Sequence, residues 1–151
     1  MSGKEKITLE SLIARHLSCN RLCGLKFVSD IDVLIHSLDL ISKKNTRASP
    51  GIDNLTLEGL NLNILKDLSN SLGSGSYKPM PSVRKYIPKP DGRKKPLGIP
   101  SYRDKIVQQA ILLGLEYSLE PIFLDTSHGF RTGRNCHTAV KYFQRRFSSI
   151  R

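Results

Sequence analysis

Residues 83–100 read VRKYIPKPDGRKKPLGIP and are the most informative stretch of the chain. Asp91 and Gly92 stand between two extended runs, and this dipeptide favours the tight turn of a β-hairpin. Prolines on both sides of the turn cannot donate to a strand ladder, so we predict that both strands are edge strands. Basic side chains on an exposed edge oppose edge-to-edge aggregation, and the same cations can lie along a phosphate backbone.

Apolar residues recur at helical spacing on both sides of this hairpin. The predicted helices cover about residues 9–17, 31–44, 61–72, 102–119 and 135–147. Asp30 and Ser101 are the predicted N-caps of the second and fourth helices, and Gly73 is placed as the C′ glycine of the third. The fourth helix has an apolar face so broad that burial on more than one side is expected. The predicted class is α+β, with helices packed around a short antiparallel β-hairpin.

The charge of the chain is strongly asymmetric. The 151 residues suit one domain, and a hydrophobic content of 38% allows a modest core. Residues 1–76 contain nine Lys and Arg and eight Asp and Glu, whereas residues 77–151 contain fifteen Lys and Arg and five Asp and Glu. The second half therefore carries nearly all of the net charge of +11. This excess of basic residues predicts a polyanionic partner, and nucleic acid is favoured over a membrane surface. Neither a transmembrane run nor a secretory signal is predicted.

Two basic segments are candidate phosphate-binding sites. The first is the hairpin and the start of the next helix, with the cations Arg84, Lys85, Lys89, Arg93, Lys94, Lys95, Arg103 and Lys105. The second is the loop over residues 127–134, which leads into a helix N-terminus where Arg131 and Arg134 could clamp an anion. A glycine-containing turn with solvated arginines is the alternative interpretation of this loop, and its composition does not decide between them.

Catalytic and metal sites are not predicted. Two-metal phosphoryl transfer needs carboxylates that hold two cations close together, and the five acidic residues after residue 76 offer no convincing pair. His16, Cys19 and Cys23 match no standard zinc spacing, and Cys136 and His137 are distant in sequence. The sequence also lacks the lysine and spacing of a P-loop.

Several short motifs occur in an order that resembles a known family. They are SPGID at 49–53, GSYKP at 75–79, YIPKPDG at 86–92, KPLGIP at 95–100, DKIVQ at 104–108, LEPIF at 119–123 and SHGFR at 127–131. Each motif is weak by itself, but the ordered set over about residues 46–145 resembles group II intron reverse transcriptases, also called maturases.

The resemblance implies the fingers region of a right-hand polymerase. Residues 46–151 are then a reverse-transcriptase-like fingers subdomain, and residues 1–45 are an N-terminal helical extension. In the family the basic hairpin contacts template RNA and the incoming nucleotide. Lys89 and Lys95 match the cations near the nucleotide phosphates, and Arg131 and Arg134 match the loop that supports the template path. Lys95 stands where arginine is common, which loses a planar bidentate fork for phosphate.

The same resemblance implies that neither palm nor thumb is present, because the catalytic aspartates of the family come later than Arg151. We therefore expect no enzyme activity from the chain alone and no cofactor, with Mg²⁺ entering only if a palm-bearing partner completes the site.

Two functional hypotheses follow from these residues and the resemblance. A third alternative is a truncated reading frame without function. One is a non-catalytic protein that binds structured RNA, either intron RNA or rRNA, within a ribonucleoprotein such as an intron complex or an organellar ribosome. The other is one piece of a split reverse transcriptase. The expected partners are RNA and other proteins, with no membrane. The expected location is the mitochondrion, as an organelle-encoded protein, with plastid or bacterial cytoplasm as alternatives.

Overall fold

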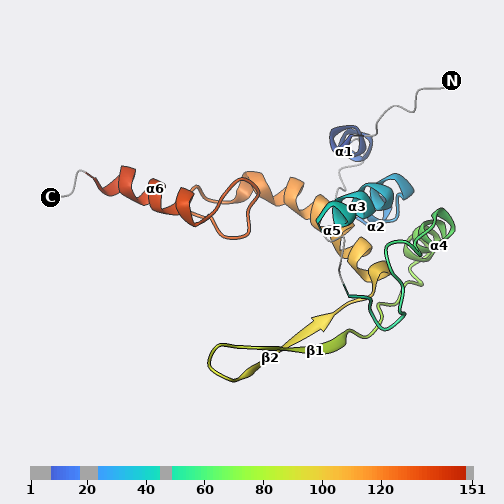
Figure 1. Cartoon of the computed structure of the whole chain (residues 1–151). Coiled ribbons are helices and arrows are strands. Elements are labelled where there is room, and N and C mark those ends of the chain that lie inside the picture. Colours follow the sequence, from blue (N-terminus) through green and yellow to red (C-terminus); the bar gives the residue numbers. More distant parts are fainter. Residues whose placement is uncertain (1–7, 18–23, 45–48, 149–151) are drawn as a thin grey trace. The chain divides into compact units, whose positions relative to one another are not determined.

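Helices and one β-hairpin make up the fold, and the predicted α+β class is confirmed (Figure 1). The computed structural model describes residues 8–17, 24–44 and 49–148. The elements are α1 (Leu9–Leu17), α2 (Leu25–Val28), α3 (Ile31–Lys44), α4 (Leu62–Gly73), β1 (Val83–Pro88), β2 (Lys94–Ile99), α5 (Tyr102–Leu119), the short 3₁₀ helix η1 (Glu120–Ile122) and α6 (Cys136–Phe147). The chain divides into two compact units, Met1–Gly114 and Leu115–Arg151.

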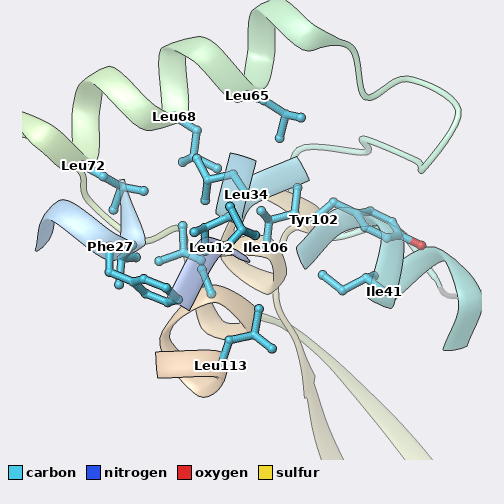
Figure 2. Packing of buried hydrophobic residues seen from close by; sticks show 14 residues of the cluster. Leu12, Phe27, Leu34, Ile41, Leu65, Leu68, Leu72, Tyr102, Ile106 and Leu113 are labelled. Atoms are coloured by element: carbon cyan, nitrogen blue, oxygen red, sulfur yellow. The ribbon is translucent and has the colours of Figure 1, made fainter. Parts of the chain in front are cut away.

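The first unit has a hydrophobic core to which all five of its helices contribute (Figure 2). Leu12 of α1, Phe27 of α2, Leu34 of α3, Leu68 of α4 and Ile106 of α5 are each fully buried in this cluster. Burial of such side chains stabilises the fold by about 1.5–3 kcal/mol each. Helices before and after residue 45 therefore share one core. The predicted boundary at residues 45–46 does not coincide with the division into units, and it stays a prediction about family resemblance.

The ends of three helices show how local sequence sets their limits. Asp30 accepts a hydrogen bond from the backbone N–H of Asp32 at 2.8 Å, and Asn61 accepts one from Ile64 at 3.0 Å, so both act as N-caps. The predicted C′ role of Gly73 is wrong. Gly73 is the last residue of α4, and Gly75 takes the left-handed conformation with φ of 72°. Its backbone N–H bonds to the carbonyl oxygen of Leu72 at 3.1 Å.

The buried carboxylate of Asp104 ties the hairpin to the helical core. It accepts hydrogen bonds from the Tyr77 hydroxyl, from the Ser101 hydroxyl at 2.8 Å and from the backbone N–H of Met80 at 3.1 Å. The Ser101 hydroxyl also accepts from the Asp104 backbone N–H at 3.1 Å, which confirms Ser101 as the cap of α5. Burial and this carboxylate raise the pKa of the Tyr77 hydroxyl. A buried charge needs such partners, and here they come from both ends of the hairpin.

Gly51 gives the SPGID segment its fixed place. A Cβ atom at this buried position would come within 2.5 Å of the Ser101 Cα atom and 2.8 Å of its backbone nitrogen. Backbone atoms cannot move aside as a flexible side chain can, so only glycine allows this approach. The loop before α4 is thereby packed against the residue that caps α5.

The outer side of α5 differs from the expectation. Tyr102, Ile106 and Leu113 are buried, but Ile111 and Leu112 are exposed, so the broad apolar face is covered on one side only. In the part of the first unit that the structure describes, no helix or strand covers the side of α5 that carries Ile111 and Leu112. Among the described residues, no helix is both long enough and apolar enough to cross a membrane.

The second unit contains the end of α5, η1, a connecting loop and α6. Asn135 caps α6 through a capping box, in which its side chain accepts from the Thr138 N–H at 3.0 Å and the Thr138 hydroxyl accepts from the Asn135 N–H at 2.9 Å. The predicted apolar side of α6 is largely exposed, with Phe143 and Phe147 in contact at a ring-centroid distance of 4.4 Å.

Replacement of Asp104 by alanine should lower the free energy of unfolding by about 3 kcal/mol, because three donors lose their acceptor in a buried site. Urea denaturation measures this loss. The control is Asp39→Ala, which removes an exposed pair with Lys43 and should cost less than about 0.5 kcal/mol. Equal losses in the two variants would contradict the role given to Asp104.

Candidate nucleic-acid interface

The turn of the β-hairpin is built around a left-handed glycine. The backbone N–H of Gly92 bonds to the carbonyl oxygen of Lys89 at 3.0 Å, and the N–H of Lys89 bonds to the carbonyl oxygen of Arg93 at 2.8 Å. Gly92 has φ of 77°, which a residue with a side chain rarely adopts. The predicted turn at Asp91 and Gly92 is confirmed as a three-residue loop.

Antiparallel pairing places basic side chains on both faces of the ribbon formed by β1 and β2. The register pairs Val83 with Ile99 and Pro88 with Lys94, and partners opposite one another share a face. One face carries Arg84, Tyr86 and Lys94, and the other carries Lys85, Ile87 and Lys95. All six side chains are exposed, so the hairpin presents cations to solvent along its length.

The cations of the hairpin differ in whether they already have a partner. Among the described residues, no carboxylate forms an ion pair with Arg84, Lys89, Lys94 or Lys95. We call these four residues the free hairpin cations. Arg93 is different, because its guanidinium donates to Asp91 at 2.7 and 2.9 Å, and these hydrogen bonds lower the pKa of the Asp91 carboxyl.

Three further predicted cations lie where the hairpin meets the helices. Lys85 donates to the Ser49 hydroxyl at 3.0 Å. Lys105 lies 4.1 Å from the centre of the Tyr102 ring and 3.5 Å from the Ser49 carbonyl oxygen, and its partial burial lowers the pKa of its ammonium group. Arg103 is half-buried and lines a pocket of about 180 Å³ beside Tyr77. These cations are therefore linked to the SPGID segment and to the core.

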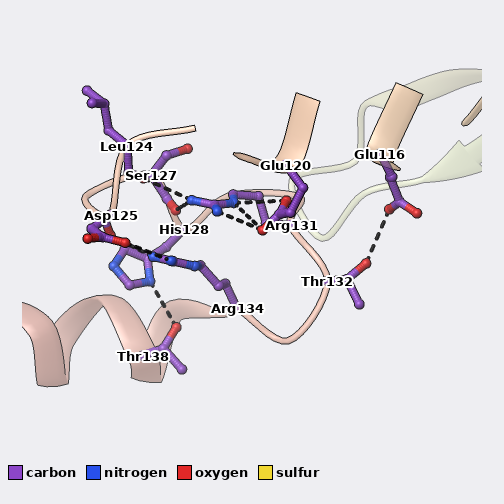
Figure 3. A network of polar contacts seen from close by, with 10 residues as sticks. All are labelled: Glu116, Glu120, Leu124, Asp125, Ser127, His128, Arg131, Thr132, Arg134 and Thr138. Atoms are coloured by element: carbon purple, nitrogen blue, oxygen red, sulfur yellow. Dashed lines mark hydrogen bonds and ion pairs between the residues drawn. The ribbon is translucent and has the colours of Figure 1, made fainter. Parts of the chain in front are cut away.

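Arg131 of the second unit has protein partners around its whole guanidinium group (Figure 3). It donates to the Glu120 carboxylate at 2.7 and 3.1 Å, and to the carbonyl oxygens of Leu124 and Ser127 at 2.9 Å each. It also lies 5.2 Å from the centre of the Phe123 ring, and its side chain is only 6% exposed. This guanidinium lowers the pKa of the Glu120 carboxyl. Arg131 holds the loop together and would have to break these contacts to bind a phosphate.

Arg134 is also engaged within the loop. It donates to the backbone carbonyl of Asp125 at 2.6 Å and to its carboxylate at 3.2 Å. Among the described residues of this unit, Lys141, Arg145 and Arg146 of α6 form no ion pair with a carboxylate. Lys141 and Arg145 line a pocket of about 340 Å³ that includes Arg134. Sequence reasoning missed this pair, although a spacing of four residues places both on one helix face.

The described part of the chain contains no candidate metal site. No group of three His, Cys, Asp or Glu side chains converges among these residues. Cys136 is an exposed free thiol, and Cys19 and Cys23 lie outside the described residues.

The sequence of the chain is similar to parts of several known proteins. It is 42% identical over 114 residues to the group II intron-encoded protein LtrA of Lactococcus lactis subsp. cremoris, a match that covers 75% of this chain and 19% of that protein. The chain is homologous to a part of the group II intron-encoded proteins. A putative COX1/OXI3 intron 1 protein of Saccharomyces cerevisiae is 34% identical over 136 residues, or 90% of this chain and 16% of that protein.

Further relatives show the range of this similarity. Protein YkfC of Escherichia coli is 35% identical over 120 residues, and the nuclear intron maturase 1 of Arabidopsis thaliana mitochondria is 39% identical over 49 residues. The match takes up less than a third of each of these four relatives. No protein-family model matches the chain. The predicted family resemblance is confirmed by the relatives themselves.

Replacement of Arg131 by alanine should loosen the loop over residues 124–134, because two carbonyl groups and Glu120 lose their donor. The local opening free energy should fall by about 2 kcal/mol. Hydrogen exchange of the amides of Ser127 and Arg134 measures this, since both bond within the loop. The control Arg146→Ala changes an exposed residue of α6 and should leave both rates unchanged. Unchanged protection in the Arg131 variant would contradict its role as an anchor.

Proposed function

We propose that the chain binds RNA along its basic hairpin. The observation that carries this proposal is the exposed ribbon with four free hairpin cations, which have no carboxylate partner among the described residues. Cations of this kind neutralise phosphates and release counterions, which supplies affinity without reading sequence. Tyr86 lies between Arg84 and Lys94 on one face, so that an aromatic ring accompanies the charges.

The RNA partner is proposed to be structured RNA within a ribonucleoprotein. The names of the relatives support intron RNA, since they include group II intron-encoded proteins and an intron maturase. An organellar ribosome remains the other assembly of this kind, and its RNA would offer the same phosphate chemistry. Other proteins of the assembly would complete the surroundings of the chain.

The chain is proposed to act without catalysis of its own. The sequence supports this with its lack of a convincing pair of carboxylates for two-metal phosphoryl transfer. The competing proposal is a split reverse transcriptase, in which a palm on another chain would supply those carboxylates and hold Mg²⁺. The exposed apolar side of α6 favours this second proposal, because a partner could cover it.

The proposed location is the mitochondrion, with plastid or bacterial cytoplasm as the alternatives. Relatives in Marchantia polymorpha and Arabidopsis thaliana carry mitochondrial names, and others come from Lactococcus and Escherichia.

Neutralising the free hairpin cations should weaken RNA binding and its dependence on salt. In Lys94→Gln/Lys95→Gln, the slope of log affinity against log salt should become shallower by about 0.7–0.9 per lost phosphate contact. Filter binding at several salt concentrations measures this slope. The combined change of all four cations to glutamine should reduce binding to the background level.

The matched control for this experiment is Asp91→Asn/Arg93→Gln. It keeps the net charge and removes only a pair that is already neutralised. Its affinity and salt slope should match those of the unaltered protein. Equal effects of the control and of the Lys94 and Lys95 variant would contradict binding through the free hairpin cations.

The pure chain should give no product in a primer-extension assay with an RNA template, a primer, Mg²⁺ and deoxynucleotides. The expected result is unextended primer at protein concentrations that saturate RNA binding. Extension that appears only after addition of a palm-bearing protein would favour the split enzyme. Extension by the pure chain would contradict the non-catalytic proposal.

A further inference from the structure

Phe130 combines full exposure with an unusual backbone conformation. Its side chain is fully exposed, and its φ of 57° lies in the left-handed region. Bulky residues adopt this region at a free-energy cost, and such strain persists only where the surrounding structure imposes it. An exposed aromatic ring on a strained backbone does not stabilise the chain itself. We therefore interpret its position as a contact site for a ligand.

The loop around Phe130 is held firmly enough to present the ring. Arg131, the next residue, is anchored to Glu120 and to two backbone carbonyls. The Thr132 hydroxyl donates to Glu116 at 3.2 Å, and the Nδ1 atom of His128 lies 3.0 Å from the Thr138 hydroxyl (Figure 3). Contacts on both sides of Phe130 therefore fix the backbone from which its ring projects. A fixed platform loses little conformational freedom when a ligand binds.

The composition of the loop points to a nucleobase as the ligand. Phe130 is the one apolar residue of residues 125–134, which read DTSHGFRTGR, and the exposed apolar side chains Ile122, Phe123 and Leu124 come before this segment. A protein-docking surface usually buries several apolar neighbours together, whereas a nucleobase stacks on a single ring. A base that is not paired can leave its helix and present its flat face to such a side chain.

We propose that Phe130 is a stacking platform for an unpaired nucleobase of the bound RNA. This inference rests on the proposed RNA-binding function and adds a second contact in the second unit. The hairpin binds phosphates and is indifferent to pairing, but Phe130 favours single-stranded segments. Because every base has an aromatic face, this contact selects unpaired RNA without selecting its sequence.

The variant Phe130→Gly tests the proposal without a loss of stability. Glycine adopts the left-handed region at no steric cost, so the variant should fold at least as well as the unaltered protein. Its affinity for an unstructured oligouridylate should fall by about 5- to 150-fold, the usual effect of losing one stacked base. Phe130→Tyr keeps the ring and should retain the affinity. An abasic ribose-phosphate oligomer of the same length should bind both variants equally.

The outcomes separate this inference from the proposed function. If Phe130→Gly binds oligouridylate unchanged while the four-cation hairpin variant does not bind it, the stacking proposal is wrong and hairpin binding stands. An equal loss on the abasic oligomer would also overturn stacking, because no base is present there. If the unaltered protein binds neither oligomer, both proposals fail. A loss confined to the oligomer with bases supports Phe130 as the platform.

Discussion

The carboxylate of Asp104 is the interaction on which the first unit depends. It is buried at the start of α5 and accepts from Tyr77, Met80 and Ser101. Two of these donors lie a few residues before β1, and the third lies directly after β2. One charged group therefore holds both ends of the hairpin against the helix that enters the core. A buried carboxylate is stable only with such a set of donors, which makes the geometry of this junction specific.

This junction determines how the basic residues are presented. The hairpin leaves the core as a two-stranded ribbon (Figure 1). The free hairpin cations on it form no ion pair with a carboxylate of the described residues. Arginines elsewhere have different roles. Arg93 is neutralised within the turn, and Arg131 and Arg134 link the parts of their loop. The formal charge of the chain thus overstates the number of cations that a phosphate backbone can reach.

The five longer helices, the caps at Asp30 and Ser101, and the turn at Asp91 and Gly92 were predictable because each depends on neighbours in the sequence, whereas the short helices α2 and η1 were not predicted. The register of the hairpin was not predicted; it is centred on Asp91, with Pro88 opposite Lys94. The predicted Gly73 cap was wrong because two glycines stand close together, and the choice between them depends on which one completes the backbone hydrogen bonds of α4. The role of Arg131 as an anchor of its loop could not be predicted from the sequence, because Glu120 lies eleven residues earlier and no periodicity links the two.

By itself, the sequence determined the α+β class, the hairpin, the concentration of charge after residue 76 and the family resemblance. These properties follow from composition, local backbone preference and ordered motifs, all of which are read along the chain. Only the tertiary structure decided which cations are free and which serve as internal anchors. It also gave Asp104 its central place and left Phe130 exposed on a left-handed backbone. Pairing and burial are set by distances between residues far apart in sequence, and these distances exist only once the chain has folded.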